Sequence, residues 1–330
     1  MSIPAFSDIA KPSNDLINKD FYHVAAAALE VKLKTPDGVN FTAKGTSAHD
    51  GPISSSIEAK KGIQNGTYFH SFSTASIPVY SSPTTHISLL SVLSPSWRQI
   101  SLHTQLTRNG AGISIIQSWN TANVLNTKVE LADSFAKDLK VEVLNNFSPA
   151  SGNKGQKLNI YFKQQQFHSR AFLDYQPSGK VTALADIVLG HEGFLVGGEA
   201  AYDVQKAALT KYSAAVGYST PTYTAAITAT NSFNIFAASY YHKVNKSVEA
   251  GTKATYDAKT GTAVGIELAS KYKIDPLSFA KAKINDRGIA SIAYNTKINS
   301  GLTFGIGGSF DTQKFNEAGH KFGTSFTFEG

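Results

Sequence analysis

The clearest chemical pattern in the sequence is lysine at alternate positions of a short segment. Lys281 and Lys283 alternate with Ala280, Ala282 and Ile284. Successive side chains of an extended chain point to opposite faces, so this segment predicts one basic face and one apolar face. A row of ammonium groups attracts anions such as phosphates and nucleotides. The first question is therefore what architecture would repeat this pattern.

Motifs that resemble catalytic or phosphate-binding sites lie in a context that favours a structural role. GIGGSF at 305–310 has the glycines of a phosphate loop, but it lies inside an alternating segment with no helix after it. Its glycines are better explained by sheet curvature. HEG at 191–193 is not a metalloprotease helix, and the nine histidines lack ligand spacing. We expect no enzymatic activity, cofactor or metal.

Composition narrows the class of protein further. The chain of 330 residues contains no cysteine, which excludes disulfides, zinc–thiolate sites and a thiol nucleophile. The net charge of +7 and the pI of about 9.2 favour anionic partners. No apolar run approaches the ~20 residues that a membrane helix needs. The N-terminus resembles neither a secretory signal nor an Arg-rich transit peptide, because Asp8, Asp15 and Asp20 interrupt it.

Hydrophobic periodicity predicts one N-terminal helix followed by strands. Residues 3–21 place apolar side chains at helical spacing, with Pro12 expected to kink or split the helix. From residue 23 the period changes to two. Residues 23–34, for example, place Leu29, Val31 and Leu33 opposite Glu30, Lys32 and Lys34. Similar segments follow along the chain and are separated by short polar turns such as PSGK (177–180) and NDRG (285–288).

Two all-β architectures fit this alternation, a soluble sandwich and a transmembrane antiparallel β-barrel. The strands are long and consecutive, and no helix is available to cover a sheet. The apolar faces are thin, while the opposite faces carry charges. A thin apolar band suits lipid, in which only a closed barrel satisfies the strand hydrogen bonds. The pattern therefore favours the membrane barrel.

The segment YKIDPLSFAKAKINDRGIASIAY (272–294) resembles the signature of the mitochondrial porins, the voltage-dependent anion channels. WNTAN (119–123), YYHKVN (240–245) and GSFDTQK (308–314) are similar to the fungal members. The signature positions are filled by Tyr272, Asp275, Pro276, Ser278, Lys281 or Lys283, Ile284, Asn285, Asp286 and Tyr294. The resemblance implies a barrel of about 19 strands with the N-terminal α-helix in its lumen.

We accordingly expect an amphipathic helix over residues 1–21 and a transmembrane barrel over 22–330, interrupted by an atypical insert at 62–108. The insert has no Asp, Glu or Lys and is rich in Ser, Thr, His, Leu and Pro. Barrel hairpins are normally short. Our hypothesis is a retained in-frame intron or an error in the gene model, and the alternative is a genuine lineage-specific loop. Sequencing of the mature transcript distinguishes the two.

Side chains that face the lumen of such a barrel set its selectivity. The predicted pore-lining residues are Asp15, Lys19, Glu30, Lys32, Lys34, Lys44, Lys60, Lys128, Lys140, Lys157, Lys163, Arg170, Lys281 and Lys283. Their net positive field predicts weak anion selectivity, because a wide pore screens charge within about 8 Å at physiological salt. Any single lysine can equally be a solvated charge without a role of its own, so the prediction concerns their sum.

The resemblance also implies further roles and exposes two departures. The helix should place Ile9, Ile17 and Phe21 against the wall, the alternative being an amphipathic segment on the membrane surface. The last strand is similar to a mitochondrial sorting signal at Lys321, Gly323, Phe326 and Phe328. Asp138 replaces the glycine of a Gly-Leu-Lys motif linked to nucleotides, which makes a discrete nucleotide site doubtful. Gln117 replaces a lipid-facing glutamate of the animal members.

The sequence thus predicts a voltage-gated, weakly anion-selective channel of the fungal mitochondrial outer membrane. Expected permeants are ATP, ADP, metabolites and small anions, and expected partners are membrane lipid, the barrel-insertion machinery and further copies of the chain in a homo-oligomer, but no nucleic acid. One alternative is the protein-translocating barrel of the same membrane, which a blocked-import assay would identify. Another is a soluble basic β-protein that binds nucleic acid, which would need aromatic platforms beside its basic residues.

Overall fold

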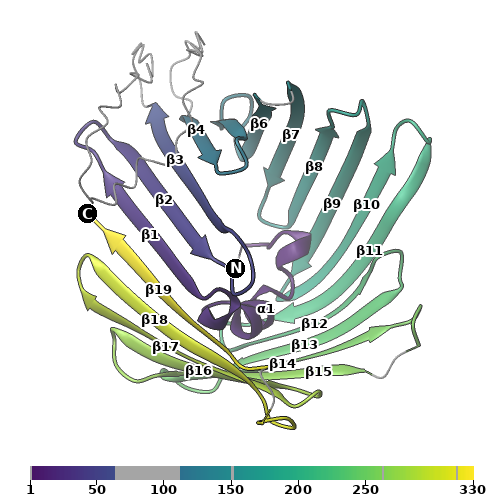
Figure 1. Cartoon of the computed structure of the whole chain (residues 1–330). Helices are drawn as coiled ribbons and strands as arrows, with labels where there is room; N and C mark the ends of the chain where they lie inside the picture. The colour runs from purple at the N-terminus through teal and green to yellow at the C-terminus, as the bar shows by residue number, and fades with distance from the viewer. Residues whose placement is uncertain (1, 64–111, 150–151, 262–263, 317–318) are drawn as a thin grey trace, which may run out of the picture.

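The computed structural model describes residues 2–63, 112–149, 152–261, 264–316 and 319–330. In these residues, nineteen strands form one continuous sheet that closes into a barrel (Figure 1). The strands are β1 Ala27–Lys34, β2 Val39–Ser47, β3 Ile53–Ile63, β4 Gly112–Asn120, β5 Leu125–Ala132, β6 Leu139–Ser148, β7 Asn153–Lys163, β8 Phe167–Tyr175, β9 Val181–His191, β10 Phe194–Asp203, β11 Ala208–Ser219, β12 Tyr223–Thr230, β13 Ile235–Lys243, β14 Val248–Asp257, β15 Gly265–Lys273, β16 Ser278–Asn285, β17 Ile289–Asn299, β18 Leu302–Asp311 and β19 Lys321–Glu329. The predicted transmembrane β-barrel is confirmed.

Each strand pairs with the next in antiparallel fashion, and the ring closes through a parallel pair. Strand β1 pairs with β19 from Ala27 opposite Thr324 to Lys32 opposite Glu329. An odd number of alternating strands makes the first and the last run in the same direction. Connections after odd-numbered strands therefore lie at one end of the barrel with Gly330, which we call the C-terminal rim. Connections after even-numbered strands lie at the other end, the N-terminal rim, where the chain enters β1.

The outer face of the barrel is apolar and bears aromatic side chains towards both rims. Ile227 is 64% exposed and Ile292 is 55% exposed, although both belong to the interior of a strand. Near the C-terminal rim the rings of Phe194 and Tyr218 are 4.6 Å apart, and near the N-terminal rim Phe310 and Phe322 are 5.3 Å apart. An apolar band between aromatic girdles is typical of a barrel surrounded by lipid. Of the described helices, none has the length and apolar character to cross a membrane.

The N-terminal segment lies inside the ring of strands (Figure 1) and is less helical than the sequence predicted. It consists of a 3-10 turn, η1 Phe6–Asp8, the helix α1 Lys11–Asn18 and a second 3-10 turn, η2 Tyr22–Val24. Pro12 stands in the first turn of α1, where its missing N–H would have no helical acceptor. The helical region is therefore split before Pro12, one of the two expected outcomes, and α1 starts beside this residue. Beyond it, Asp20 adopts a left-handed backbone with φ 58°.

The tightest packing joins this segment to the barrel wall. Ile3, Phe6 and Ile9 form one apolar cluster with Val188, Leu195, Ala215 and Ala226 of β9–β12. Leu16 and Ile17 form a second cluster with Ala269 of β15. Ile9 is 1% exposed and Ile17 is 0% exposed. The amphipathic helix thus buries its apolar stripe against the inner wall and leaves its polar face to the lumen.

The predicted insert begins later than expected. Gly62 and Ile63 continue β3 and pair with Ser114 and Ile113 of β4, so the boundary lies after Ile63 rather than after Lys61. The rest of the predicted insert, 64–108, lies outside the described residues. Strands β3 and β4 are direct neighbours, and their last described pair joins Ile63 to Ile113.

Candidate conduction pathway

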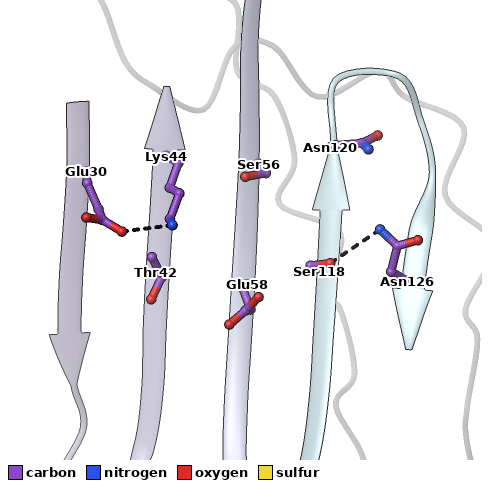
Figure 2. A pocket seen from close by; sticks show the side chains of 8 residues that line it. All are labelled: Glu30, Thr42, Lys44, Ser56, Glu58, Ser118, Asn120 and Asn126. Carbon is purple, nitrogen blue, oxygen red and sulfur yellow. Dashed lines mark hydrogen bonds and ion pairs between the residues drawn. The ribbon is translucent and has the colours of Figure 1, made fainter. Parts of the chain in front are cut away.

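The polar half of each alternating strand lines the interior of the barrel. Figure 2 shows this for β1–β5, where Glu30, Lys44, Glu58, Ser118 and their neighbours surround a cavity of about 290 Å³. The Lys44 ammonium lies 3.0 Å from the Glu30 carboxylate, which stands directly opposite it on β1. Asn126 donates a hydrogen bond of 3.4 Å to the Ser118 hydroxyl. The lining is hydrophilic, so its charged and polar side chains are stable only if the lumen is filled with water.

A luminal charge network of five residues crosses β3, β5 and β6. It consists of Lys60, Lys128, Lys140, Glu130 and Glu142. Glu130 and Glu142 stand directly opposite each other, an arrangement that repels when uncompensated. The Lys128 ammonium lies 2.6 Å from Glu130 and 3.4 Å from Glu142, and the Lys140 ammonium lies 2.7 Å from Glu142. The diagonal lysines therefore compensate the facing carboxylates.

Neutral side chains fix the two glutamates of this network. The Ser114 hydroxyl donates a hydrogen bond of 2.8 Å to Glu130. Tyr161 and Asn159 donate bonds of 3.0 Å and 3.2 Å to Glu142, whose side chain is only 6% exposed. These contacts hold both carboxylates at the wall beside the lysines. The network carries three ammonium groups and two carboxylates, so its net charge is far smaller than its lysines alone suggest.

Several other predicted pore-lining cations are paired in the same way. Arg170 binds Asp186 with two nitrogens, the shorter bond being 2.7 Å, and Asp186 is fully buried. The Lys157 ammonium lies 3.0 Å from the Asp174 carboxylate. The Lys32 ammonium lies 3.0 Å from Glu329 across the parallel closure. Asp186, Glu142 and Glu329 were missed by the sequence analysis, although each occupies an inward position in its strand's alternation.

A smaller group of predicted cations has no such compensation. Among the described residues, no carboxylate lies within 4.0 Å of the ammonium groups of Lys34, Lys163 or Lys283. Lys283 instead places its ammonium 4.7 Å from the centre of the Phe21 ring. The positive character of the lumen therefore comes from a few lysines rather than from all those predicted.

The structure gives Lys281 a position unlike that of its neighbour Lys283. Its side chain is 2% exposed, and its ammonium donates hydrogen bonds to the backbone carbonyls of Lys19 at 2.6 Å and Asp15 at 3.3 Å. The last carbonyls of a helix have no helical donor and carry partial negative charge. Lys281 thus donates to the carbonyl of Lys19, the residue that caps the C-terminal end of α1, and adds a second donor to the Asp15 carbonyl, which already accepts the Lys19 N–H at 3.0 Å. It joins the helix to β16 instead of facing the conduit.

The remaining helix residues lie as the sequence analysis proposed. The Lys19 ammonium lies 2.9 Å from the Asp15 carboxylate, and both side chains are partly exposed to the lumen, at 60% and 38%. Phe21 is buried at 4% exposure. Arg170 donates a hydrogen bond of 3.3 Å to Ser7, and Ser13 donates one of 3.1 Å to the Thr252 carbonyl. Polar contacts therefore fix the segment at several heights of the wall.

The Asp-Pro turn of the signature has a local structural explanation. The Asp275 carboxylate accepts hydrogen bonds from the backbone N–H groups of Leu277 and Ser278, each at 2.7 Å, and from the Ser278 hydroxyl. The Ser278 hydroxyl and these N–H groups lower the pKa of Asp275 below its usual value. The turn stands at the C-terminal rim between β15 and β16. It fixes the start of the strand that carries Lys281.

The structure also shows where Asp138 and Gln117, the two residues that differ from the family pattern, and the predicted sorting signal are located. Asp138 has a left-handed backbone (φ 64°), a conformation in which glycine carries no strain. Gln117 points outward, because its neighbours Ser114 and Ser118 face the lumen. Phe326 and Phe328 are 38% and 42% exposed on the outer face of β19, whereas Lys321 and Gly323 stand on its inner side. The targeting role of these four residues stays a prediction.

Comparison with known proteins identifies relatives along the whole chain. The family model described as eukaryotic porin matches residues 2–323. The "Mitochondrial outer membrane protein porin" of Neurospora crassa is 50% identical over 329 residues, with 100% of both chains covered. The protein of the same name from Candida albicans is 38% identical, with 99% of both covered. "Non-selective voltage-gated ion channel 1" of Saccharomyces cerevisiae is 31% identical, with 100% of both covered.

Proposed function

Because the chain belongs to the eukaryotic porin family, we propose that it is a voltage-gated channel of the mitochondrial outer membrane. Metabolites, nucleotides such as ATP and ADP, and small ions would cross it by passive diffusion. One observation carries this proposal: a closed ring of strands has an apolar outer face and a charged inner face. Such a barrel offers a polar route through lipid and requires no chemical reaction.

The selectivity that we propose is weakly anionic. Lys34, Lys163 and Lys283 present uncompensated charge to the lumen, and the paired residues contribute little beyond their small net excess. An ion that passes at a Debye length from the wall interacts only weakly with each charge. The channel should therefore discriminate between ions by the summed field of the lysines and not at a single binding site.

The proposal is tested by recording from the refolded full chain in a planar lipid bilayer. In a potassium chloride gradient, we expect a reversal potential that favours chloride, and we expect conductance to fall as the voltage is raised in either direction. A cation-favouring open state would contradict the selectivity, and a conductance independent of voltage would contradict the gating. A blocked-import assay with an unfolded presequence protein tests the translocating alternative, in which the chain would arrest the polypeptide.

We also propose that the residues between β3 and β4 are not needed for the channel. Ile63 and Ile113 already pair as neighbours, so a two-residue Asn-Gly turn can join them when residues 64–112 are replaced by it. We expect the shortened chain to refold and to give the same conductance and reversal potential. A shortened chain that does not insert, beside a full chain that does, would contradict this proposal and would favour a genuine loop over a retained intron.

A further inference from the structure

The inner wall carries glycine at several points where the N-terminal segment approaches it closely. In the described residues, seven inward glycines from six strands each lie beneath a residue of this segment. They are Gly190 beneath Ile3, Gly197 beneath Phe6, Gly217 beneath Ile9, Gly251 beneath Leu16, Gly305 and Gly307 beneath Tyr22, and Gly323 beneath Tyr22 and Ala25. These glycines are dispersed in sequence, and the path of the N-terminal segment is what they share.

The approach is closest on the last two strands. A Cβ atom on Gly323 would lie 2.0 Å from the Ala25 carbonyl oxygen and 2.1 Å from the Tyr22 carbonyl oxygen. A Cβ atom on Gly305 would lie 2.3 Å from the nearest atom of the Tyr22 ring. Neither position can hold a larger residue unless the segment above it moves. By contrast, a Cβ atom on Gly155, which also faces inward, would meet its nearest atom at 3.6 Å, an ordinary contact.

Hydrogen bonds fix residues 22–26, which we call the clasp, above these glycines. Asn295 donates a hydrogen bond of 2.5 Å to the Tyr22 hydroxyl. Ala26 accepts one from the Thr324 N–H at 3.2 Å and donates its own N–H to the Ser47 carbonyl at 2.9 Å. The clasp therefore binds strands on both sides of the parallel closure between β1 and β19. Its position defines where the rest of the N-terminal segment enters the lumen.

We propose that Gly305, Gly307 and Gly323 form the seat of the clasp, and that Gly323 is thereby a positioning residue for the luminal segment. This assignment is additional to the part of Gly323 in the predicted sorting signal. The seat acts in the closed barrel, where the Ala25 and Tyr22 carbonyl oxygens leave no room for a Cβ atom on Gly323. This steric requirement is distinct from the predicted targeting role.

The experiment measures docking of the segment directly, so its result does not depend on the proposed channel function. The chain has no native cysteine, so Ser13→Cys introduces a single thiol. Ser13 is 2% exposed while the segment is docked. In the refolded full chain, we expect Gly323→Ala to raise the maleimide labelling rate of this thiol by about tenfold or more, because labelling follows the population of the undocked state. The control Gly155→Ala should leave the rate unchanged.

A double-mutant cycle separates displacement of the clasp from general damage to the sheet. The methyl group of Gly305→Ala meets the Tyr22 ring, so its effect should disappear in a Tyr22→Ala background. The methyl group of Gly323→Ala meets backbone carbonyls, so its effect should persist in that background. Equal labelling of Gly323→Ala, Gly305→Ala and Gly155→Ala would overturn the proposal. So would an effect of Gly305→Ala that is the same with and without Tyr22.

Failure to refold is also informative in this design. If Gly305→Ala does not form the barrel alone but does so together with Tyr22→Ala, the fault lies in the clasp and the proposal is supported. If the double variant fails as well, while Tyr22→Ala alone refolds, the methyl group disturbs the sheet itself and the proposal is overturned. Far-ultraviolet circular dichroism in detergent reports the strand content of each variant.

Discussion

Replacing both Glu130 and Glu142 by glutamine should make the open channel distinctly more anion-selective. The substitution retains side chains that can accept the hydrogen bonds of Ser114, Asn159 and Tyr161. It removes the two carboxylates that compensate Lys60, Lys128 and Lys140. The net charge of the luminal charge network then rises from +1 to +3. The reversal potential in a salt gradient should move further towards that of chloride.

The size of the effect follows from screening. A unit charge about 8 Å from an ion in water contributes roughly 0.5 kcal/mol before ionic screening, which changes the local anion concentration by about 2.4-fold at most. Two carboxylates therefore change it by about sixfold at most. The shift should shrink as the salt concentration is raised, because the screening length falls. Recordings at low and high potassium chloride test both the direction and this dependence.

A matched control uses a carboxylate at the rim. Glu192 lies in the turn between β9 and β10 with its side chain 82% exposed, so Glu192→Gln removes a charge that water already screens. Its reversal potential should stay close to that of the unmodified chain. A Glu130→Gln, Glu142→Gln double variant that behaves like this control would show that the network does not influence permeating ions. Unchanged thermal unfolding is the check that the double variant retains its barrel.

The barrel itself was predictable because one physical rule governs every strand. Alternate residues must face either lipid or water, so the pattern around Lys32 and Lys281 identifies both faces without knowledge of neighbouring strands. The parallel closure between β1 and β19 is a consequence of the strand number, which came from the family resemblance and not from periodicity. The helix was predicted too long because its apolar spacing extends over η1, which is a separate 3-10 turn, and on to Phe21, beyond the end of α1 at Asn18.

The candidate site was less predictable because its electrostatics depend on register. Within its own strand Lys128 has one carboxylate partner, Glu130 at 2.6 Å, and only the pairing of β5 with β6 brings it to Glu142 as well. Arg170 is compensated in the same way, because the register of β8 and β9 places Asp186 directly opposite it. Strand periodicity determines which face a residue occupies, but it does not specify its partner across the sheet. A lysine count therefore overestimates the field in the lumen.

Lys281 and Lys283 give the clearest example of residues whose different partners cannot be predicted from strand periodicity. The two residues share a strand, a face and a charge, and both ammonium groups lie close to the Phe21 ring, at 4.9 and 4.7 Å. Their difference arises from the N-terminal segment, whose last helical turn is placed over one of them. No periodicity within β16 could indicate this, since the partner is more than 260 residues away in sequence.

Lys281→Met should loosen the helix without opening the barrel. Methionine preserves much of the side-chain volume, but it cannot donate to the carbonyls of Lys19 and Asp15. A hydrogen bond that involves a charged group contributes about 1.5–3 kcal/mol, so the undocked population should rise roughly ten- to hundredfold. Hydrogen–deuterium exchange of the peptide that covers α1 should accelerate accordingly, while exchange in β3–β8 should not change.

Lys283→Met is the decisive comparison, because it also removes one positive charge and one contact with the Phe21 ring from β16. Lys283→Met, which removes a charge that faces the lumen, should lower the anion preference of the open channel, but only Lys281→Met should accelerate exchange in α1. Equal protection of α1 in the two variants would show that Lys281 acts as a solvated charge like its neighbour. If α1 is the element that moves when voltage closes the pore, Lys281→Met should also close at a lower voltage than Lys283→Met. Each variant loses one positive charge, so a difference in exchange rate or closing voltage measures how strongly the hydrogen bonds of Lys281 stabilise the docked helix.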